Sequence, residues 1–196
     1  MKKENLLHIF SHMPTLQTER LVLRPLRASD ATDMFAYAKD PAVTEFLLWS
    51  PHPDPTHTRA YLEYITGRYR IGTCHDWAVV CREDGRMIGT CGFARVDCPH
   101  NVGEVGYVIN PAYRGHGLAA EAVTRVLRFG FDVMGLHRIE ARYIVGNNAS
   151  RRVMEKTGMT FEGVRRESML VKGRYRDIGT CAILVQDFRA AQQKNE

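Results

Sequence analysis

Two glycines near the middle of the chain stand where a strand-like segment runs into a helix-like one. Residues 104–109 read as a strand, Gly115 and Gly117 lie in the following loop, and residues 118–131 repeat apolar pairs every four positions. The first backbone N–H groups of a helix have no partner inside it and lie at the positive end of its dipole, so they bind anions. Glycine lets the backbone approach a phosphate closely, and Arg114 adds positive charge. The spacing therefore predicts a site for a phosphate-bearing cofactor.

Two other nucleotide-binding motifs fit this loop less well. A P-loop needs Gly-Lys-Ser or Gly-Lys-Thr after its glycines, and that sequence is absent. Gly115, Gly117 and Ala120 fit the Rossmann spacing, whose acidic ribose ligand would then be Glu140. However, Glu140 lies inside a predicted strand rather than at its end. The loop also follows several antiparallel-looking strands instead of opening a βαβ unit, which argues against a Rossmann domain.

Four segments of the chain, in the same order, resemble the GNAT superfamily of N-acetyltransferases. The loop Arg114-Gly-His-Gly-Leu-Ala119 is similar to the pyrophosphate loop of that family. A second patch, Asn147-Asn-Ala-Ser150 followed by Met154-Glu-Lys156, is similar to a helix of the family. Residues 16–26 and 173–177 resemble the branch that contains the ribosomal-protein N-terminal acetyltransferases. The resemblance covers nearly the whole chain and implies transfer of an acetyl group from acetyl-CoA to a primary amine.

The resemblance also implies where acetyl-CoA binds. In this family the strand before the loop splays from its neighbour, and pantetheine lies in the gap like an extra strand. Asn147 would reach the pantetheine arm, and His116 would act through its backbone rather than its imidazole. The cofactor-binding residues that the resemblance implies are Tyr107, Val108, Ile109, Arg114, Gly115, His116, Gly117, Leu118, Ala119 and Asn147.

Glu104 is the predicted general base. In a strand, Glu104, Gly106 and Val108 share one face, so the missing side chain of Gly106 leaves space beside the carboxylate for an acetyl group and an amine. A carboxylate at that place removes a proton from the amine directly or through water, or it only binds and orients the amine. The alternative is an ordinary strand carboxylate that faces solvent.

Ser150 is the predicted proton donor for the leaving thiolate. Many members of the family carry a tyrosine seven residues after the helix asparagine, but that position is Met154 here, which cannot donate a proton. Ser150 lies three residues after Asn147 and would substitute for the tyrosine, as in the ribosomal-protein branch. The alternatives are a serine that bonds the backbone at the helix start and a thiol, of pKa about 8.5, that leaves without help.

Four residues come from segments that border the acceptor groove in this family. Trp49, Arg174 and Tyr175 are predicted to line the groove, whereas packing in the core or at its rim is favoured for Phe46. The loops of this groove choose the acceptor. The branch resemblance favours the N-terminal α-amine of a protein, and a small amine such as a polyamine, an amino acid or an antibiotic is the alternative.

The remaining pattern predicts the elements that position these residues. Strands are predicted at 21–24, 77–81, 87–96, 104–109 and 137–145, with a closing hairpin of 159–171 and 174–185. Helices are predicted at 29–39, 55–69, 118–131 and 149–157, with a short amphipathic helix in an N-terminal extension, residues 1–14. Together they predict an α/β (α+β) protein with the GNAT fold. It would have one domain over residues 1–196, in which helices flank a single central, mixed, mostly antiparallel and splayed sheet.

The composition argues against several classes of binding partner. The chain has 196 residues and a net charge of +5, with no basic stripe that would indicate nucleic-acid binding. No apolar stretch approaches the roughly 20 residues of a membrane span, and His8, Ser11 and His12 interrupt the one segment that faintly resembles a secretion signal. The expectation is a cytoplasmic protein. The five cysteines and eight histidines are dispersed, so neither a disulfide framework nor a metal site is predicted.

Other readings stay open at this point. Met154, in the place of the acid tyrosine, makes a catalytically silent acyl-CoA-binding sensor conceivable, although Glu104 argues against it. A nucleic-acid-binding module is a third and weaker option. A homodimer is one option for the assembly, because edge strands in such folds often pair. The sequence does not separate acetyl from a slightly longer acyl donor.

Overall fold

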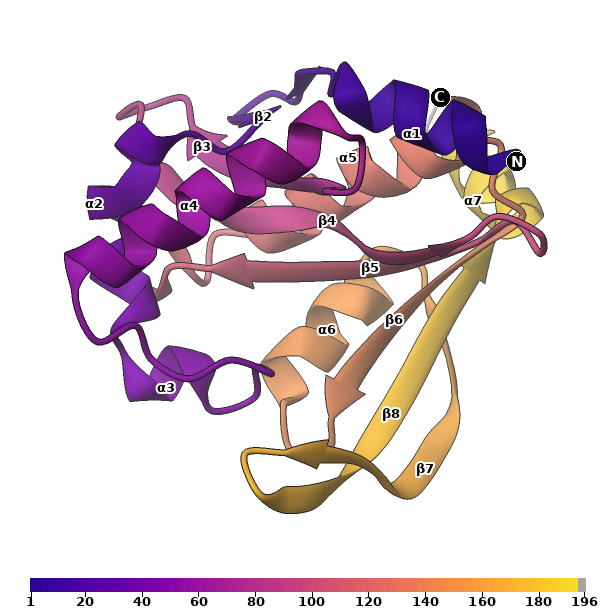
Figure 1. The fold of residues 1–196 in the computed structure, drawn as a ribbon. Coiled ribbons are helices and arrows are strands. Elements are labelled where there is room, and N and C mark those ends of the chain that lie inside the picture. Colours follow the sequence, from indigo (N-terminus) through magenta and orange to yellow (C-terminus); the bar gives the residue numbers. More distant parts are fainter. Residues whose placement is uncertain (194–196) are drawn as a thin grey trace.

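The computed structural model describes residues 1–193 and contains an eight-stranded sheet in the order β1-β2-β3-β4-β5-β6-β8-β7 (Figure 1). Strands β5 and β6 pair in parallel, and every other neighbouring pair is antiparallel. The strands are β1 (Leu16–Gln17), β2 (Leu21–Arg24), β3 (Asp76–Cys81), β4 (Met87–Asp97), β5 (Val102–Ile109), β6 (Arg138–Ile144), β7 (Thr160–Val171) and β8 (Arg174–Leu184). The predicted fold class is confirmed.

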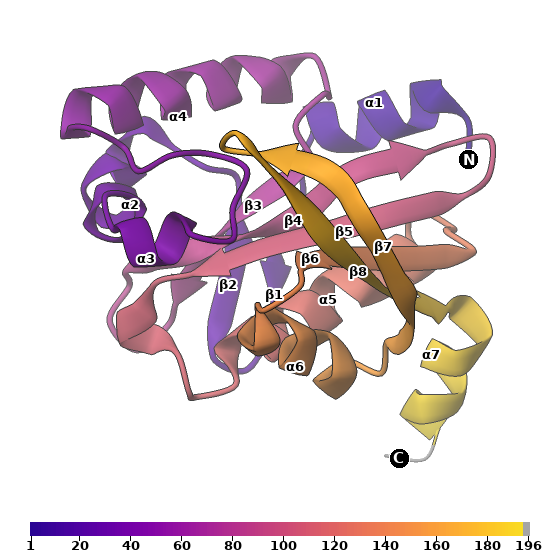
Figure 2. The same ribbon diagram turned by 90° about the horizontal axis from the view of Figure 1, so that it is seen from below.

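Helices cover both faces of this sheet. Figure 2 shows α4 on one side of the sheet and α5 with α6 on the other. The helices are α1 (Lys3–Ser11), α2 (Ala31–Ala38), α3 (Pro41–Thr44), α4 (Pro55–Arg70), α5 (Leu118–Asp132), α6 (Asn148–Lys156) and α7 (Val185–Gln193), with 3-10 turns η1 (Ala28–Asp30) and η2 (Pro111–Tyr113). Among the described residues, no helix is long and apolar enough to cross a membrane.

Each face has its own apolar core. On the α5 face, Val123, Val126 and Leu127 are fully buried and pack with Trp77 and other strand residues. On the other face, Met34 and Tyr37 of α2 and Leu62 of α4 pack against Ala78 and Met87. Because α5 repeats its apolar residues every three or four positions, one stripe of the helix lies against the sheet.

Capping residues and a glycine mark the N-termini of α4, α6 and α5. Asp54 accepts a hydrogen bond from the backbone N–H of His57 at 2.8 Å, and Pro55 takes the first helical position of α4. Asn147 caps α6 in the same way, through the N–H of Ser150 at 3.1 Å. Gly117 precedes α5 with φ of +79°, a conformation that favours glycine.

The sequence patterns missed three elements. Strand β1 pairs with β2 through a turn in which Leu21 N–H donates to Thr18 Oγ1 at 2.9 Å. Pro41 ends the helix before it, as predicted, but it also begins α3, because Asp40 caps the N–H of Ala42 at 2.8 Å. Helix α7 has no strong start signal after β8 and was not predicted.

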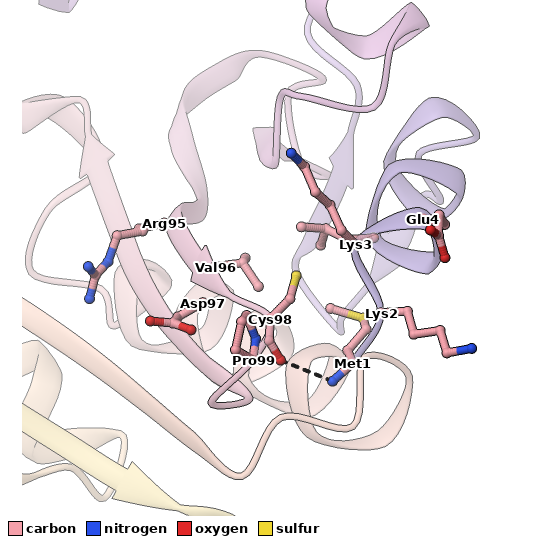
Figure 3. A pocket seen from close by; sticks show the side chains of 10 residues that line it. Met1, Lys2, Lys3, Glu4, Arg95, Val96, Asp97, Cys98 and Pro99 are labelled. Carbon is pink, nitrogen blue, oxygen red and sulfur yellow. Dashed lines mark hydrogen bonds between the residues drawn. The ribbon is translucent and has the colours of Figure 1, made fainter.

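Helix α1 lies within the segment 1–14 that was predicted to be an extension. Its start is held against the turn between β4 and β5, because the Met1 ammonium donates to the carbonyl oxygen of Cys98 at 3.3 Å (Figure 3). The same ammonium also contacts Asn101 Oδ1. An open hollow of about 740 Å³ lies beside these residues, with Lys2, Lys3 and Asp97 in its wall.

Candidate active site

Strands β5 and β6 separate in the middle of the sheet. Their parallel pairing covers Val102 to Glu104 and then stops, while β6 continues beside β8 as far as Ile144. Figure 1 shows the two strands diverging from this point. Residues 105–109 therefore present backbone groups on the side of β5 where no strand pairs with them. The splay that the family resemblance predicted is present.

A pocket of about 630 Å³ occupies the splay. Its wall combines β5 from Glu104 to Ile109 with the following loop, the end of β6 and the first turns of α6. Residues 46–48, Met169 and Ile178 close the side that lies toward the β7–β8 hairpin. Segments far apart in the sequence thus meet around one hollow of the size of a ligand pocket.

Glu104 lies in this wall at the point where the strands part, and its residue is 9% exposed. Its Oε2 atom lies 2.7 Å from a guanidinium nitrogen of Arg142 on β6. Its other carboxylate oxygen has no hydrogen-bond partner in residues 1–193. A Cβ built at Gly106 would meet only Ala94 Cβ, at 3.8 Å, so open space adjoins the carboxylate. One carboxylate oxygen is therefore held by Arg142, and the other is free to bind an amine.

Ser150 lies in the wall on the other side of β5. Alternation along the strand places Tyr107 on the α5 face, opposite to Glu104, and the Tyr107 hydroxyl reaches both the carbonyl oxygen and Oγ of Ser150, at 2.9 and 3.0 Å. The serine hydroxyl therefore has a phenol partner, and no bond from it to the backbone is found in residues 1–193. Burial raises the pKa of Tyr107 well above its ordinary value, which keeps the phenol protonated.

The loop before α5 presents a row of backbone donors. Gly115 and Gly117 have φ of +89° and +79°, and the N–H groups of residues 115–120 have no hydrogen-bond partner in the described part of the chain. A Cβ at Gly115 would meet nothing within 4 Å. Successive free N–H groups at the start of a helix fit a diphosphate. The loop can therefore hold the pyrophosphate of coenzyme A.

Arg20, from the turn between β1 and β2, braces this loop from outside. Its guanidinium donates to the carbonyl oxygen of His116 at 2.9 Å and pairs with Glu121 of α5 at 2.6 Å. Hydrogen bonds from Thr18 and Arg20, and the charge of Arg20, outweigh burial and lower the pKa of Glu121. Neither Arg20 nor Glu121 was predicted, because the contact joins segments about a hundred residues apart.

The structure brings together most of the predicted cofactor residues. Tyr107, Val108, Ile109 and Asn147 line the pocket, and so do five residues of the loop and helix start, Arg114, Gly115, Gly117, Leu118 and Ala119. His116 is the exception, since its side chain is not in the wall and its carbonyl oxygen meets Arg20. The Asn147 side-chain oxygen caps α6.

Of the four residues considered for the acceptor groove, one lines the pocket and three do not. Phe46 lines the pocket and packs beside Ile144 and Ile178. Trp49 packs against the core shared by α2 and α4, with its ring centroid 5.3 Å from that of His52, and does not line the pocket. Arg174 and Tyr175 are exposed near the tip of the β7–β8 hairpin and do not line the pocket.

Three cationic residues of the wall were missed by sequence reasoning. Arg142 stands two residues beyond Glu140 on β6, and Arg152 and Lys156 lie one turn apart on α6. The spacing of the α6 pair was a usable signal, because residues i and i+4 of a helix share a face. Within residues 1–193 there is no cluster of three His, Cys, Asp or Glu side chains that would hold a metal.

Comparison with known proteins decides the family. Residues 20–160 match the acetyltransferase (GNAT) domain. The chain belongs to the GNAT family of acetyltransferases. Proteins of this family are N-acetyltransferases that typically bind acetyl-CoA, so the predicted enzyme class is confirmed.

Curated relatives of this N-acetyltransferase agree with the assignment. The uncharacterized N-acetyltransferase p20 of Bacillus licheniformis is 31% identical over 90% of this chain and 99% of its own length. The [Ribosomal protein uS5]-alanine N-acetyltransferase of Escherichia coli is 27% identical over 88% of this chain and 92% of its own.

A solved GNAT-family acetyltransferase from Bacillus anthracis has the same fold. It is 28% identical to this chain, covers 88% of it with 99% of its own length, and gives a TM-score of 0.79.

Proposed function

We propose that this N-acetyltransferase acetylates the N-terminal α-amine of a protein with the acetyl group of acetyl-CoA. One observation carries the proposal: a single pocket joins the free N–H groups of the loop to the free oxygen of Glu104. The choice of a protein acceptor rests on the relatives, which include an enzyme named for acetylating an alanine of ribosomal protein uS5. The predicted cytoplasmic location and the option of a homodimer stay predictions.

The cofactor would lie along the α5 side of the splay. The N–H groups of residues 115–120 would bind the pyrophosphate, with Arg114 at the rim, where its Nε already donates to the carbonyl oxygen of Ile109 at 3.1 Å. The unpaired side of β5, residues 105–109, would bind pantetheine, together with the amide nitrogen of Asn147. Arg152 and Lys156 would add positive charge for the phosphate group of coenzyme A that is not part of the pyrophosphate.

Bound acetyl-CoA supplies a thioester whose carbonyl carbon accepts the amine. The free oxygen of Glu104 would take the proton that the amine nitrogen releases as the C–N bond forms. The Ser150 hydroxyl, held by Tyr107, would give a proton to sulfur as the C–S bond breaks. A backbone N–H of β5 would stabilise the negative carbonyl oxygen. Acetyl transfer then leaves the acceptor neutral at nitrogen and coenzyme A as a thiol.

The energetics favour an α-amine. Deprotonating an α-amino group of pKa about 8 at neutral pH costs about 1 kcal/mol, whereas a lysine of pKa near 10.4 costs about 4–5 kcal/mol. Only one oxygen of the Glu104 carboxylate is free to take the proton, because the other is bonded to Arg142, so the lower cost matters. The same comparison separates this proposal from acetylation of lysine side chains.

A panel of acceptors tests the proposal. Purified enzyme and acetyl-CoA would be incubated with N-terminal peptides, polyamines and free amino acids, and mass spectrometry would locate each added acetyl group. We expect acetylation of peptide α-amines and none of internal lysines. Transfer to polyamines or amino acids alone would contradict the N-terminal acceptor and leave acetyl transfer intact. Tight binding of acetyl-CoA with no transfer to any acceptor would contradict the enzyme mechanism and favour the sensor reading.

A further inference from the structure

The acceptor side of the pocket carries little negative charge. Among the residues that line the pocket, Glu104 is the one carboxylate, and Arg142 already pairs with it at 2.7 Å. Arg142 is itself part of the wall, so the two charges cancel beside the place where the amine must lie. An acceptor with several positive charges, such as a polyamine, would find no further carboxylate in the wall to bind its second ammonium group.

Beyond this pair the groove becomes apolar and then basic. Ile144 pairs with Ile178 across β6 and β8, and Phe46 and Met169 pack on them. Met169 of β7 is the cross-strand partner of Arg176 on β8. Directly paired residues share a face of the sheet, and so do residues two apart on one strand. Arg176 therefore lies on the same face as Ile178 and Met169, one pair further out.

Arg176 has no partner in the described chain. Its residue is half-buried and its Nε atom is buried without a hydrogen bond, and no ion pair or side-chain hydrogen bond of Arg176 occurs in residues 1–193. Leaving a buried donor of a charged group unpaired costs free energy. The half-buried guanidinium as a whole is therefore without an acceptor in residues 1–193, and a carboxylate matches a guanidinium best.

The hairpin around Arg176 adds to this charge. Residues 165–177 contain five cations (Arg165, Arg166, Lys172, Arg174 and Arg176) and two carboxylates (Glu167 and Asp177). One oxygen of the Asp177 carboxylate accepts the backbone N–H of Glu167 at 2.8 Å, and the cations still outnumber the carboxylates. The hairpin also closes over the groove, since Lys172 Nζ donates to the carbonyl oxygen of Thr44 at 2.5 Å. An acceptor that runs out of the pocket along this face meets a positive potential.

We propose that Arg176 binds an acidic side chain of the acceptor, so that this enzyme selects protein N-termini with Asp or Glu a few residues from the α-amine. The inference rests on the proposed N-terminal acceptor and names its class. Glu104 on β5 is paired with Glu140 on β6, and Glu140 is paired with Ala182 on β8, so the three residues lie in one row across the sheet. Arg176 lies six residues before Ala182 on β8. Six residues of strand span about 20 Å, so an extended acceptor reaches Arg176 within about its first six residues.

A series of peptides with glutamate at successive positions tests the role of Arg176. In a neutral ten-residue peptide, one Glu is moved through positions two to eight, and each peptide is compared with its Gln counterpart by kcat/KM. We expect about a tenfold preference for Glu at one or two adjacent positions between three and seven. Added salt should weaken the preference, because the contact is partly exposed. Arg176→Gln should remove it, Arg176→Lys should retain part of it, and Arg176→Glu should shift it to Lys at the same position.

A matched control separates this arginine from net charge. Arg128→Gln makes the same charge change on the exposed part of α5 and should leave the preference intact. Equal kcat/KM for Glu and Gln peptides at every position, with transfer still efficient, would overturn the role of Arg176 and spare the proposed function. A Glu preference that persists in both Arg176→Gln and Arg176→Glu would overturn it as well. Failure to acetylate any peptide would contradict the proposed function itself, and this inference with it.

Discussion

The two sides of the splay are built in different ways. On the cofactor side, the donors are backbone N–H groups of one continuous stretch, residues 115–120, supported by α6. On the acceptor side, residues 46–48, Arg142 and Ile144 of β6, and Ile178 of β8 come from three separate segments and contribute side chains. Backbone donors tolerate many changes of side chain. In the proposed function, the cofactor side would therefore supply the family's common chemistry, whereas the acceptor side would select the individual substrate.

Removing the free carboxylate oxygen at Glu104 is expected to have the largest effect. Glu104→Gln should lower kcat by about 10²–10⁴-fold, the usual contribution of a general base, with the Kd for acetyl-CoA unchanged. Glu140→Gln is the matched control, because Glu140 pairs with Glu104 across the strands and pairs with Arg138 rather than lining the pocket. Single-turnover transfer and titration calorimetry would measure both. Equal losses in the two variants would contradict a base at Glu104.

The cofactor side should respond to backbone changes. Gly117→Ala adds a Cβ at φ of +79°, where strain costs about 1 kcal/mol, and crowds the row of donors. We expect the Kd for acetyl-CoA to rise about tenfold while the acceptor KM stays the same. Gly135→Ala is the control, since its φ is +66° and a Cβ there meets nothing within 4 Å. It should lose stability without losing affinity. If Gly117→Ala binds acetyl-CoA normally, the loop is not the pyrophosphate site.

The proton donor should matter less than the base. Ser150→Ala is expected to reduce kcat by about tenfold or less, because a thiol of pKa about 8.5 leaves without much help. Tyr107→Phe removes the phenol that bonds Ser150 Oγ at 3.0 Å, so its effect should largely disappear when Ser150 is already alanine. Transfer rates of the two single variants and the double variant measure this coupling. Additive losses would show that the two hydroxyl groups act separately.

Asp76 provides the smallest and most specific test. Burial raises the pKa of the Asp76 carboxyl to about 7, and no ion pair of Asp76 occurs in residues 1–193, unlike Glu104 with its arginine. The native state favours the protonated form, so wild-type stability should fall as pH rises from about 4 to about 7. Asp76→Asn should therefore raise Tm relative to wild type above pH 7, with no gain below pH 4. A difference in Tm that is independent of pH would contradict this assignment.

The sequence predicted the parts of the site whose chemistry is local. The loop glycines and the strand alternation around Glu104 depend on neighbours in the chain, and the structure has both of them. Side-chain contacts between segments far apart in the sequence could not be predicted. The contact of Arg142 with Glu104 depends on the parallel register of β5 and β6, and that of Arg20 with the loop depends on a turn formed by β1. The packing of Trp49 against the core of α2 and α4 also depends on contacts across the fold, and its place in the groove stays a prediction.

A crystal structure with a peptide linked through its α-nitrogen to coenzyme A would test the central claim most directly. We predict that the pyrophosphate contacts the N–H groups of residues 115–120, that the linked nitrogen lies within hydrogen-bond reach of Glu104, and that the sulfur lies near Ser150 Oγ. A glutamate placed in the peptide should meet Arg176. Coenzyme A bound elsewhere, for instance in the hollow beside α1, or a linked nitrogen far from Glu104, would contradict the account.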